Sequence, residues 1–346
     1  MQKKGQTLEP AKKQKIVLIH KGMRSFVKKD YQILATHYRV AEFGYTAPKG
    51  LVINLWYQLK LLGWLLRHLP GSKLVYIWFA GYHSFLPVLL GRLMKKKILI
   101  AIGGYETTYI PEIRYGVFSN PLRSFMARFS FKQAHLLLPV DNSILENLKR
   151  FVPDLTTPSR ELTTGYDATF WKRIAPKEAM VLTVASLNSE VVFRRKGIDL
   201  FIETARLLPD IMFVIVGVED AVRGLIPDLT NIQALPATDA QGLRKYYSRA
   251  KVYAQFSMYE GFPNVVSEAM LCECIPVVTA VSGMPRQVGE CGFVLEERDA
   301  HQAAALIQKA LQAPPEQGQQ CRQRMVEHFP FNKREKELLE IVGQYV

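Results

Sequence analysis

Short apolar runs alternate with helical stretches along most of this chain, and this alternation constrains its fold more than any other feature. Apolar runs bounded by turn residues predict buried strands, and strands that alternate with helices are typical of βαβ units with parallel sheets. We therefore predict an α/β protein. The predicted strands are residues 15–19, 74–79, 97–102, 134–140, 180–185, 211–216, 252–256, 275–279 and 292–295.

The predicted strands fall into two groups, and 346 residues are enough to build two domains from them. Turn residues are concentrated between residues 158 and 176, so we place the hinge there. Two facing sheets leave a cleft at the carboxyl ends of their strands, where open α/β sheets bind ligands. The predicted helices are residues 25–36, 85–94, 122–133, 143–151, 197–207, 240–249, 300–311 and 333–345.

The excess of positive over negative charge lies in the first half of the chain. The formal net charge is +14, and residues 1–170 carry 25 Lys and Arg against 10 Asp and Glu. A basic half attracts nucleic acid, an anionic membrane or a phosphorylated substrate. No RNA-reading module or zinc finger is recognisable, so we predict no nucleic-acid partner. An anionic membrane attracts each nearby Lys or Arg by about 1 kcal/mol, so a few side chains suffice for reversible docking.

The segment 51–69 is the most apolar long stretch of the chain, and its length approaches that of a membrane span. Two interpretations remain open for it. It forms a nearly buried helix of the first domain, or its Trp56 and Trp64 surface enters lipid headgroups beside basic residues. Five polar residues interrupt the segment, so we predict that it does not span a membrane: Asn54, Gln58, Lys60, Arg67 and His68.

Two features of the sequence indicate a cytoplasmic protein. Residues 1–15 are polar and basic and lack the apolar core of a signal peptide. The cysteines are few and follow no zinc-binding spacing, so we expect free thiols in a reducing compartment. They are Cys272, Cys274, Cys291 and Cys321.

Two carboxylates, Glu260 and Glu268, flank a Gly-Phe-Pro loop and the start of a predicted helix over 263–272. Amides at the start of that helix can face an anion, and the helix dipole favours a diphosphate there. Glu260 can accept hydrogen bonds from sugar hydroxyls, and Glu268 can accept them from a ribose. Diphosphate, sugar and ribose together make a nucleotide sugar. The donor site would then include Gly261, Phe262, Pro263, Asn264 and Val265.

The order of these motifs resembles retaining glycosyltransferases with two Rossmann-like domains, the GT-B type, and family 4 (glycosyl transferases group 1) in particular. Their signature of Glu, seven residues and Glu is met by Glu260 and Glu268. The resemblance implies an acceptor-binding first domain, residues 1–168, and a nucleotide-sugar-binding second domain, residues 169–329. It also implies that a C-terminal helix, residues 330–346, crosses back onto the first domain.

A cationic turn, Arg194-Arg195-Lys196-Gly197, follows the first strand of the second domain. Cations beside a helix start suit a diphosphate, on which charge grows as the sugar bond breaks. The resemblance assigns this role to Lys196, since Lys-Gly stands where the family has it. The family also has an Arg where this chain has Ser186, so we predict that Arg194 or Arg195 supplies the missing guanidinium.

The first domain offers several acceptor-side candidates. Gly103 stands where the family often has a His, and an acidic residue follows it as Glu106, which we expect to project into the cleft. His83 follows another strand and could take a proton from an acceptor. The loop of His20 to Phe26 could bind an anionic acceptor or form a plain surface turn. The acceptor-side set is Gly103, Gly104, Tyr105, Glu106, Gly22 and Arg24, with Lys21 beside them; in the second domain, Leu235 could line the nucleobase slot.

From these features we predict a retaining glycosyltransferase that moves a sugar from a nucleotide-diphosphate sugar to an acceptor, either lipid-linked or a precursor of a cell-surface polysaccharide. The family resemblance implies no protein nucleophile. No DxD-like carboxylate pair ends a strand, so we predict no metal and no cofactor beyond the donor substrate. We expect contact with the inner face of an anionic membrane. The alternatives are a non-catalytic nucleotide-sugar-binding protein and a glycoside hydrolase that uses Glu260 and Glu268 as acid and base.

Overall fold

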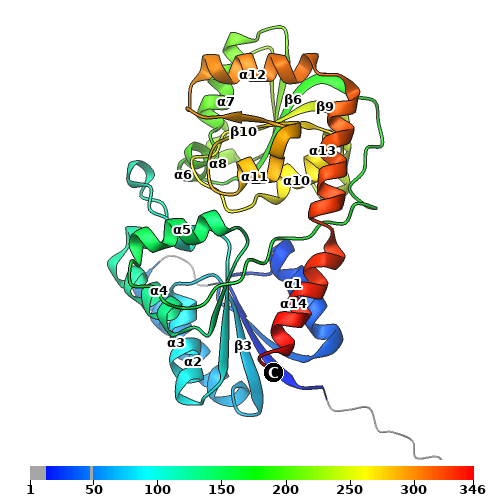
Figure 1. Cartoon of the computed structure of the whole chain (residues 1–346). Coiled ribbons are helices and arrows are strands. Elements are labelled where there is room, and N and C mark those ends of the chain that lie inside the picture. The colour runs from blue at the N-terminus through cyan, green and yellow to red at the C-terminus, as the bar shows by residue number, and fades with distance from the viewer. Residues whose placement is uncertain (1–12, 47–49) are drawn as a thin grey trace, which may run out of the picture.

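Two parallel sheets, each enclosed by helices, form two domains that lie one above the other in Figure 1. This is a computed structural model of the chain, and it describes residues 13–46 and 50–346. The expectation that the first fifteen residues lack a signal-peptide core therefore falls, for residues 1–12, outside the described part. Every strand pair in both sheets is parallel.

The first sheet has five strands in the order β2-β1-β3-β4-β5. Its strands are β1 (Lys15–His20), β2 (Arg39–Gly44), β3 (Ser72–Trp78), β4 (Lys97–Ile102) and β5 (Leu136–Pro139). Its helices are α1 (Ser25–His37), α2 (Leu51–His68), α3 (Tyr82–Leu93), α4 (Pro121–Gln133) and α5 (Asn142–Phe151), with 3-10 turns at Tyr105–Thr107, Pro111–Ile113 and Val117–Ser119. Helices α2, α3 and α4 cover one face, and α1 covers the other (Figure 1).

The second sheet has six strands in the order β11-β10-β9-β6-β7-β8. Its strands are β6 (Glu178–Leu187), β7 (Met212–Val218), β8 (Ile232–Leu235), β9 (Ala250–Gln255), β10 (Ile275–Thr279) and β11 (Phe293–Leu295). The helices are α6 (Glu190–Arg195), α7 (Ile198–Leu207), α8 (Asp220–Arg223), α9 (Ala240–Arg249), α10 (Asn264–Leu271), α11 (Met284–Val288), α12 (Ala300–Gln312), α13 (Pro315–His328) and α14 (Phe331–Gly343), with a 3-10 turn at Gly289–Cys291.

The central strands are largely apolar because helices cover both faces of each sheet. In β1, Ile16, Val17, Leu18 and Ile19 are all 0% exposed. All nine predicted strands are present. The prediction missed β2 and β8, which are edge strands with partly exposed side chains and no continuous apolar run. It also missed α13, whose buried face holds only Gly318, Cys321 and Met325.

Helix α2 lies on the outside of the first domain and is apolar on its exposed side as well. The part of the chain that the structure describes contains no helix with the length and apolar character needed to cross a membrane. Trp64 packs against Phe43 and stacks on His68, whereas Trp56 is exposed. Helix α2 is therefore not nearly buried. Its exposed large apolar side chains are Val52, Leu55, Trp56, Leu59 and Leu66.

The last helix, α14, packs beside α1 of the first domain (Figure 1). Arg334 of α14 makes two hydrogen bonds of 2.8 Å to the carboxylate of Asp30 in α1, and both side chains are buried. Tyr76 and Trp78 also donate to Asp30, at 2.7 and 2.9 Å. Arg334 donates in addition to the carbonyl of Leu162. This fully bonded ion pair fixes the C-terminal helix to the first sheet.

Replacing Arg334 by Met should destabilise the protein by about 3–5 kcal/mol, because it leaves the Asp30 charge buried without its cation. The matched control is Arg160→Met, since Arg160 binds Glu340 of the same helix at 3.1 Å but both side chains are solvent-exposed. An exposed pair contributes about 0–1 kcal/mol. Urea unfolding followed by circular dichroism measures both changes. Equal, small losses in the two variants would contradict the stabilising role of the Asp30 pair.

Candidate active site

Glu260 lies in the loop between β9 and α10, and its carboxylate is the centre of a compact charged group. The ammonium of Lys196 donates to Oε1 of Glu260 at 2.5 Å, and the guanidinium of Arg195 donates to the same oxygen at 3.2 Å. The hydroxyl of Ser257 adds a third bond at 2.9 Å. Burial by itself would raise the pKa of Glu260, but the two cations outweigh it and the pKa is lowered. The sequence motifs near 195 and 260 thus meet, as expected.

A glycine allows the cationic turn to reach Glu260. Gly197 precedes α7 with φ +69°, in the left-handed region that favours glycine. A Cβ at this position would lie 1.9 Å from the carbonyl oxygen of Phe256, at the end of β9. The turn therefore contacts the strand end directly. Arg194 instead pairs with Glu190 on the exposed side of α6, at 2.9 Å. The geometry supports Arg195 and Lys196 as donor-site cations and gives no support for Arg194.

The two domains meet at backbone distance beside this charged group. A Cβ at Gly261 would lie 2.1 Å from the carbonyl oxygen of Gly103, so the second-domain loop packs against the first-domain glycines. The hydroxyls of Thr107 and Tyr259 bond across the same contact at 2.8 Å. Gly104 has φ +126° and faces the amide of Gly261. These glycines permit the carboxyl ends of the two sheets to approach each other closely.

Glu106 supports this approach from inside the first domain. Its carboxylate accepts the amide of Gly103 at 2.8 Å and that of Gly104 at 3.2 Å. The side chain is 0% exposed, and burial raises the pKa of its carboxyl to about 7. The expectation that Glu106 projects into the cleft is therefore wrong, because the two amides hold it inward. Its two hydrogen bonds stabilise the turn at Gly103 and Gly104.

Helix α10 begins at Asn264, one residue later than predicted, because Pro263 is extended at φ −69° and ψ 122° and forms the cap. Amides in a first helical turn have no preceding carbonyl within the helix, so this turn can still face an anion. The side chain of Asn264 links the domains. It accepts from the hydroxyl of Tyr166 at 2.9 Å and donates to Ser25 at 3.3 Å. Phe262 is buried against Phe329.

Glu268 lies two turns into α10 in a largely apolar setting. The hydroxyl of Tyr247 donates to it at 3.3 Å. Burial raises the pKa of Glu268 to about 7, and the positive charge of Lys29 in α1 opposes that effect. Lys29 itself donates to the carbonyl of Gly165 at 2.8 Å and lies 4.7 Å from the ring centre of Tyr166. A first-domain cation therefore acts on the carboxyl predicted to bind ribose.

The other predicted residues lie at various distances from this group. His83 is buried in α3, where its Nε2 donates to the carbonyl of Trp78 at 2.9 Å, and burial lowers its pKa to about 3. Ser186 is exposed at the end of β6. Gly22 and Arg24 lie in the loop between β1 and α1 of the first domain. Val265, in the first turn of α10, and Leu235, at the end of β8, are partly exposed. The roles proposed for these residues stay predictions.

Several contacts of the group could not be read from the sequence. The ring of Tyr115 lies 4.9 Å from the guanidinium of Arg195, although 80 positions separate them. Asn147 donates to the hydroxyl of Tyr259 at 3.2 Å, and Lys29 approaches Glu268 from a different domain. No short motif surrounds Tyr115, Asn147 or Lys29, so the sequence carries no local signal for them.

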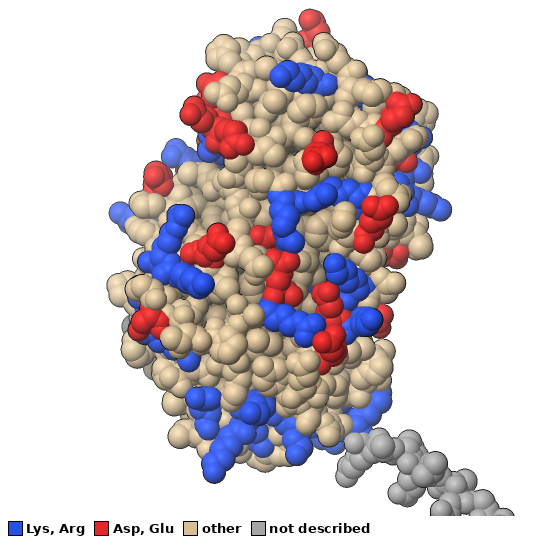
Figure 2. Space-filling model, viewed as in Figure 1, with Lys and Arg blue, Asp and Glu red and all other residues tan. Residues whose placement is uncertain are grey.

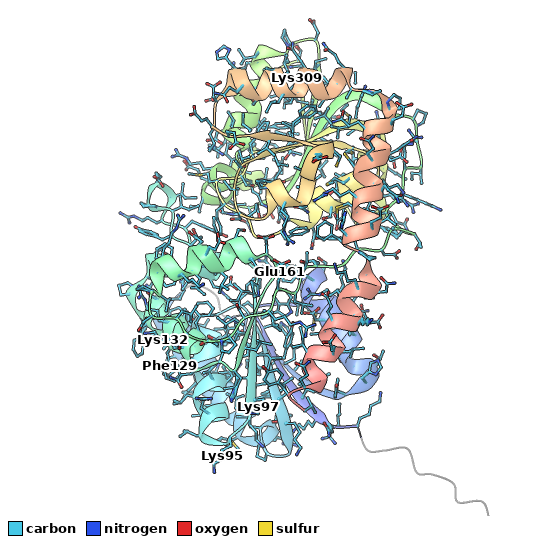
Figure 3. The ribbon with its side chains drawn as sticks, viewed as in Figure 1. Lys95, Lys97, Phe129, Lys132, Glu161 and Lys309 are labelled. Carbon is cyan, nitrogen blue, oxygen red and sulfur yellow. The ribbon has the colours of Figure 1, made fainter. Side chains whose placement is uncertain are left out.

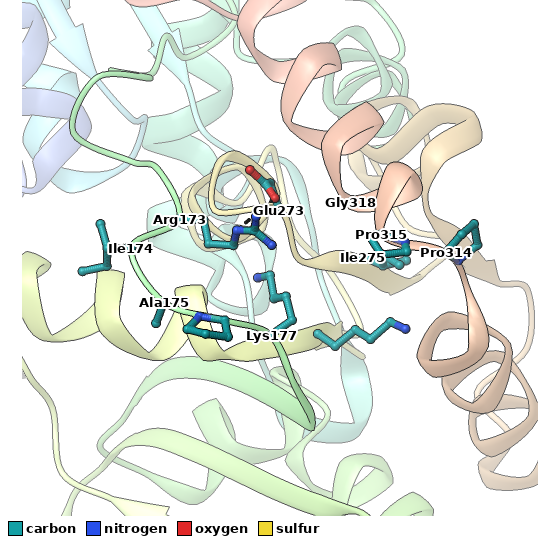
Figure 4. Close-up of a pocket in the computed structure, with 11 residues that line it drawn as sticks. Arg173, Ile174, Ala175, Lys177, Glu273, Ile275, Pro314, Pro315 and Gly318 are labelled. Atoms are coloured by element: carbon teal, nitrogen blue, oxygen red, sulfur yellow. Dashed lines mark ion pairs between the residues drawn. The ribbon is translucent and has the colours of Figure 1, made fainter.

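A cavity of about 810 Å³ opens away from this group, between the hinge, the beginnings of β9 and β10, and α13. In Figure 4, Arg173 and Glu273 pair beside it, at 3.2 Å. Lys177 also lines it, but its ammonium is occupied by carbonyls, including those of Tyr247 and Cys272. None of the predicted site residues lines this cavity. We interpret its walls as the attachment of the hinge to the second sheet.

Among residues 13–46 and 50–346, no three His, Cys, Asp or Glu side chains are arranged to hold a metal ion. All four cysteines are buried and free. The prediction that the reaction uses no metal rests on the cations that flank the expected diphosphate position, and it stays a prediction.

Comparisons with known proteins identify the second domain and the fold. Residues 170–328 match the family model "Glycosyl transferases group 1". A Campylobacter jejuni protein, N-acetylgalactosamine-N,N'-diacetylbacillosaminyl-diphospho-undecaprenol 4-alpha-N-acetylgalactosaminyltransferase, is 26% identical over 226 residues, which are 60% of this chain. The match spans 59% of that relative's length.

Two solved structures match nearly the whole chain. Sucrose-phosphate synthase of Thermosynechococcus elongatus has a TM-score of 0.77 at 18% identity, over 96% of this chain and 98% of its own. HepE of Anabaena, solved with UDP and glucose, has a TM-score of 0.73 at 14% identity, over 96% of this chain and 100% of its own. The resemblance to group 1 glycosyltransferases and the predicted two-domain GT-B fold are confirmed.

The raised pKa of Glu268 makes a testable contribution to stability. Between about pH 4.5 and 7 the native state keeps a proton that the unfolded chain has released, so this carboxyl makes the protein less stable as the pH rises. Glu268→Gln removes the effect. We expect the free energy of unfolding of the variant, minus that of the wild type, to increase between pH 5 and 7. This difference should become constant above about pH 8. Parallel pH profiles would contradict the assignment.

Proposed function

We propose that this chain, a GT-B protein whose residues 170–328 match the group 1 glycosyltransferase model, transfers a sugar with retention from a nucleotide-diphosphate sugar to an acceptor hydroxyl. The observation that carries the proposal is the convergence of Arg195 and Lys196 on Glu260 at the contact between the two domains. Two cations beside one carboxylate provide charge for a diphosphate and an acceptor for sugar hydroxyls in a single place.

Each residue of this group has a distinct proposed task. Lys196 and Arg195 bind the diphosphate and neutralise the charge that grows on it as the anomeric C–O bond breaks. Glu260 orients the sugar through its hydroxyls, and Glu268 accepts from the ribose. The Nε of Arg195 is buried and has no hydrogen-bond partner among the described residues. The first turn of α10, at Asn264, faces the same diphosphate.

The proposed reaction needs no protein nucleophile. The acceptor oxygen bonds to the anomeric carbon on the face from which the diphosphate leaves, which preserves the configuration. The acceptor proton passes to an oxygen of the leaving diphosphate, so atoms and charge balance. The protein aligns the two substrates and excludes water when the domains are closed. The contact of Gly261 with Gly103 supports such a closed arrangement.

We further propose that the acceptor is lipid-linked or a precursor of a cell-surface polysaccharide, and that the chain works at the inner face of an anionic cell membrane. The name of the Campylobacter relative includes a diphospho-undecaprenol substrate, which supports a lipid carrier. The exposed apolar side of α2, with Trp56 and Leu59, supports membrane contact. Figure 2 shows Lys and Arg gathered at the end of the first domain away from the second, where Figure 3 labels Lys95 and Lys97.

Substitutions at the charged group test the reaction. A thermal-shift screen of UDP-, GDP-, ADP- and dTDP-sugars first identifies the donor, since a ligand that binds the native state raises its melting temperature. Glu260→Ala should then lower kcat by about 100-fold or more while the fold is retained. Lys196→Ala should weaken binding of the nucleoside diphosphate by about tenfold or more, measured by calorimetry.

Arg194→Ala is the matched control for Lys196→Ala, because Arg194 is a cation of the same turn that pairs with Glu190 at the surface. It should leave the dissociation constant within about twofold. Equal losses in both variants would remove the specific role of Lys196. Release of sugar from a simple glycoside without any nucleotide would favour the glycoside hydrolase alternative, and donor binding without transfer to any acceptor would favour a binding protein.

Membrane contact is tested by sedimentation with vesicles. The wild type should bind vesicles that contain anionic phosphatidylserine, and binding should decline as salt rises, since the attraction is screened over about 10 Å at 0.1 M. Replacing Trp56 and Leu59 by Gln should reduce binding, whereas Leu207→Gln, an exposed apolar residue of the second domain, should not. Equal binding to neutral vesicles would contradict the charge mechanism.

A further inference from the structure

Three cations lie on the first-domain side of the contact between the domains, without a carboxylate partner in the described part of the chain. Lys21 and Arg24 come from the loop after β1, and Arg123 comes from the first turn of α4. The ammonium of Lys21 lies 5.7 Å from the ring centre of Tyr105, and the guanidinium of Arg123 donates to the hydroxyl of the same side chain. Arg123 also lies 5.2 Å from the ring centre of Tyr82.

The charges of this cluster repel one another. Burial is the largest cause that lowers the pKa of Lys21, and the charges of Arg123 and Arg24 lower it further. The charge of Glu106 opposes these effects on Lys21, but the oxygens of Glu106 are engaged by backbone amides. Three like charges at one wall of a cleft are relieved by an anion, and an anion with several oxygens can bind all of them at once.

Two aromatic rings separate this cluster from the cations assigned to the donor. The guanidinium of Arg195 lies 4.9 Å from the ring centre of Tyr115. The ring of Tyr115 lies 5.1 Å from that of Tyr105, with an edge-to-face arrangement. Tyr105 in turn contacts Lys21 through its ring and Arg123 through its hydroxyl. Lys21 and Arg123 are therefore separated from the donor cations by two rings, whereas the charge of Arg24 also acts on Lys196 and lies between the two groups.

We propose that Lys21, Arg24 and Arg123 bind a phosphate or diphosphate group carried by the acceptor. The proposal rests on the proposed glycosyltransferase function and names the chemical class of its acceptor. Arg123 supplies a planar fork that suits phosphate oxygens, and Lys21 supplies a point charge. The aromatic rings of Tyr105 and Tyr82 hold these cations in place.

The cluster also adjoins helix α2. Gln58 of α2 donates to the backbone carbonyl of Tyr82 at 2.7 Å, so the residue whose ring supports Arg123 is bonded to this helix. Trp56 and Leu59, on either side of Gln58 in the sequence, are exposed. A phosphate bound at the cluster could belong to a soluble sugar phosphate or to a lipid diphosphate whose chain follows α2. The phosphate chemistry is the same in both cases, and separate measurements distinguish them.

The first measurement detects the anion site without relying on transfer. The donor site is saturated with the nucleoside diphosphate, and inorganic pyrophosphate is then titrated by calorimetry. We expect a second binding event that Arg123→Gln and Lys21→Gln each weaken by about tenfold or more. Arg128→Gln is the matched control, since Arg128 lies on the same helix and over an aromatic ring, that of Phe118 at 5.3 Å. It should bind pyrophosphate as the wild type does.

Absence of the second event, or an equal effect of Arg128→Gln, would overturn the proposal. The result does not depend on catalysis: a protein that binds pyrophosphate at this site but transfers no sugar would contradict the proposed function and leave the anion site standing. A protein that transfers sugar while the two variants behave as wild type would contradict the anion site alone.

The second measurement identifies the source of the phosphate. KM is compared for three acceptors with the same sugar: a methyl glycoside, a soluble sugar phosphate, and a polyprenyl-diphosphate-linked sugar in vesicles. Arg123→Gln should raise KM by about tenfold for the phosphorylated acceptor in use and leave the methyl glycoside unchanged. An effect on the lipid-linked acceptor alone indicates a lipid diphosphate, and an effect on the soluble one indicates a sugar phosphate. An equal change for all three would overturn the proposal.

Discussion

The placement of a buried carboxylate between two cations governs the architecture of this site. An ionised Glu260 removed from water would be strongly unfavourable without partners, and Lys196 and Arg195 in the same setting would be unfavourable without an anion. Each charge therefore requires the others, and the segments that carry them must meet. This requirement explains why Gly197 stands beside the carbonyl of Phe256, where any side chain would push the cationic turn away. It also means that contacts within the protein already hold the two cations and the carboxylate in place, as the proposed donor site requires.

The sequence was sufficient for the fold and for the residues that belong to short motifs. Apolar runs that alternate with helical stretches predicted nine strands, and all nine are present. The motifs of Glu260 and Lys196 were predicted to meet at one site, and their side chains do meet. It was insufficient where the answer depends on packing. The sequence does not distinguish Arg194 from Arg195, because both are arginines of the same segment. Only the orientation of α6 decides which of them reaches Glu260. The edge strands β2 and β8 lacked an apolar run because their side chains are partly exposed, whereas the edge strand β5 is fully buried and was predicted.

Residues supplied by the other domain were invisible for a different reason. Tyr115, Lys29 and Arg123 act across the cleft or between separate elements, and their positions follow from how two sheets face each other rather than from any local pattern. Glu106 was found at the right place but with the wrong orientation. The amides of Gly103 and Gly104 bond to its carboxyl inside the first domain, and these two bonds hold it away from the domain contact.

The chain passes between the domains twice, and the two passages lie side by side. Tyr166 and Pro330 pair as neighbouring extended segments, with the amide of Tyr166 bonded to the carbonyl of Phe329 and the amide of Phe331 bonded back to Tyr166. A Cβ at Gly165 would lie 2.8 Å from the Cα of Phe331, so the passages touch. Two coupled connections leave essentially one rotational degree of freedom, a swing about a short axis through Tyr166. Any opening of the two domains would then be widest far from that axis and smallest beside it.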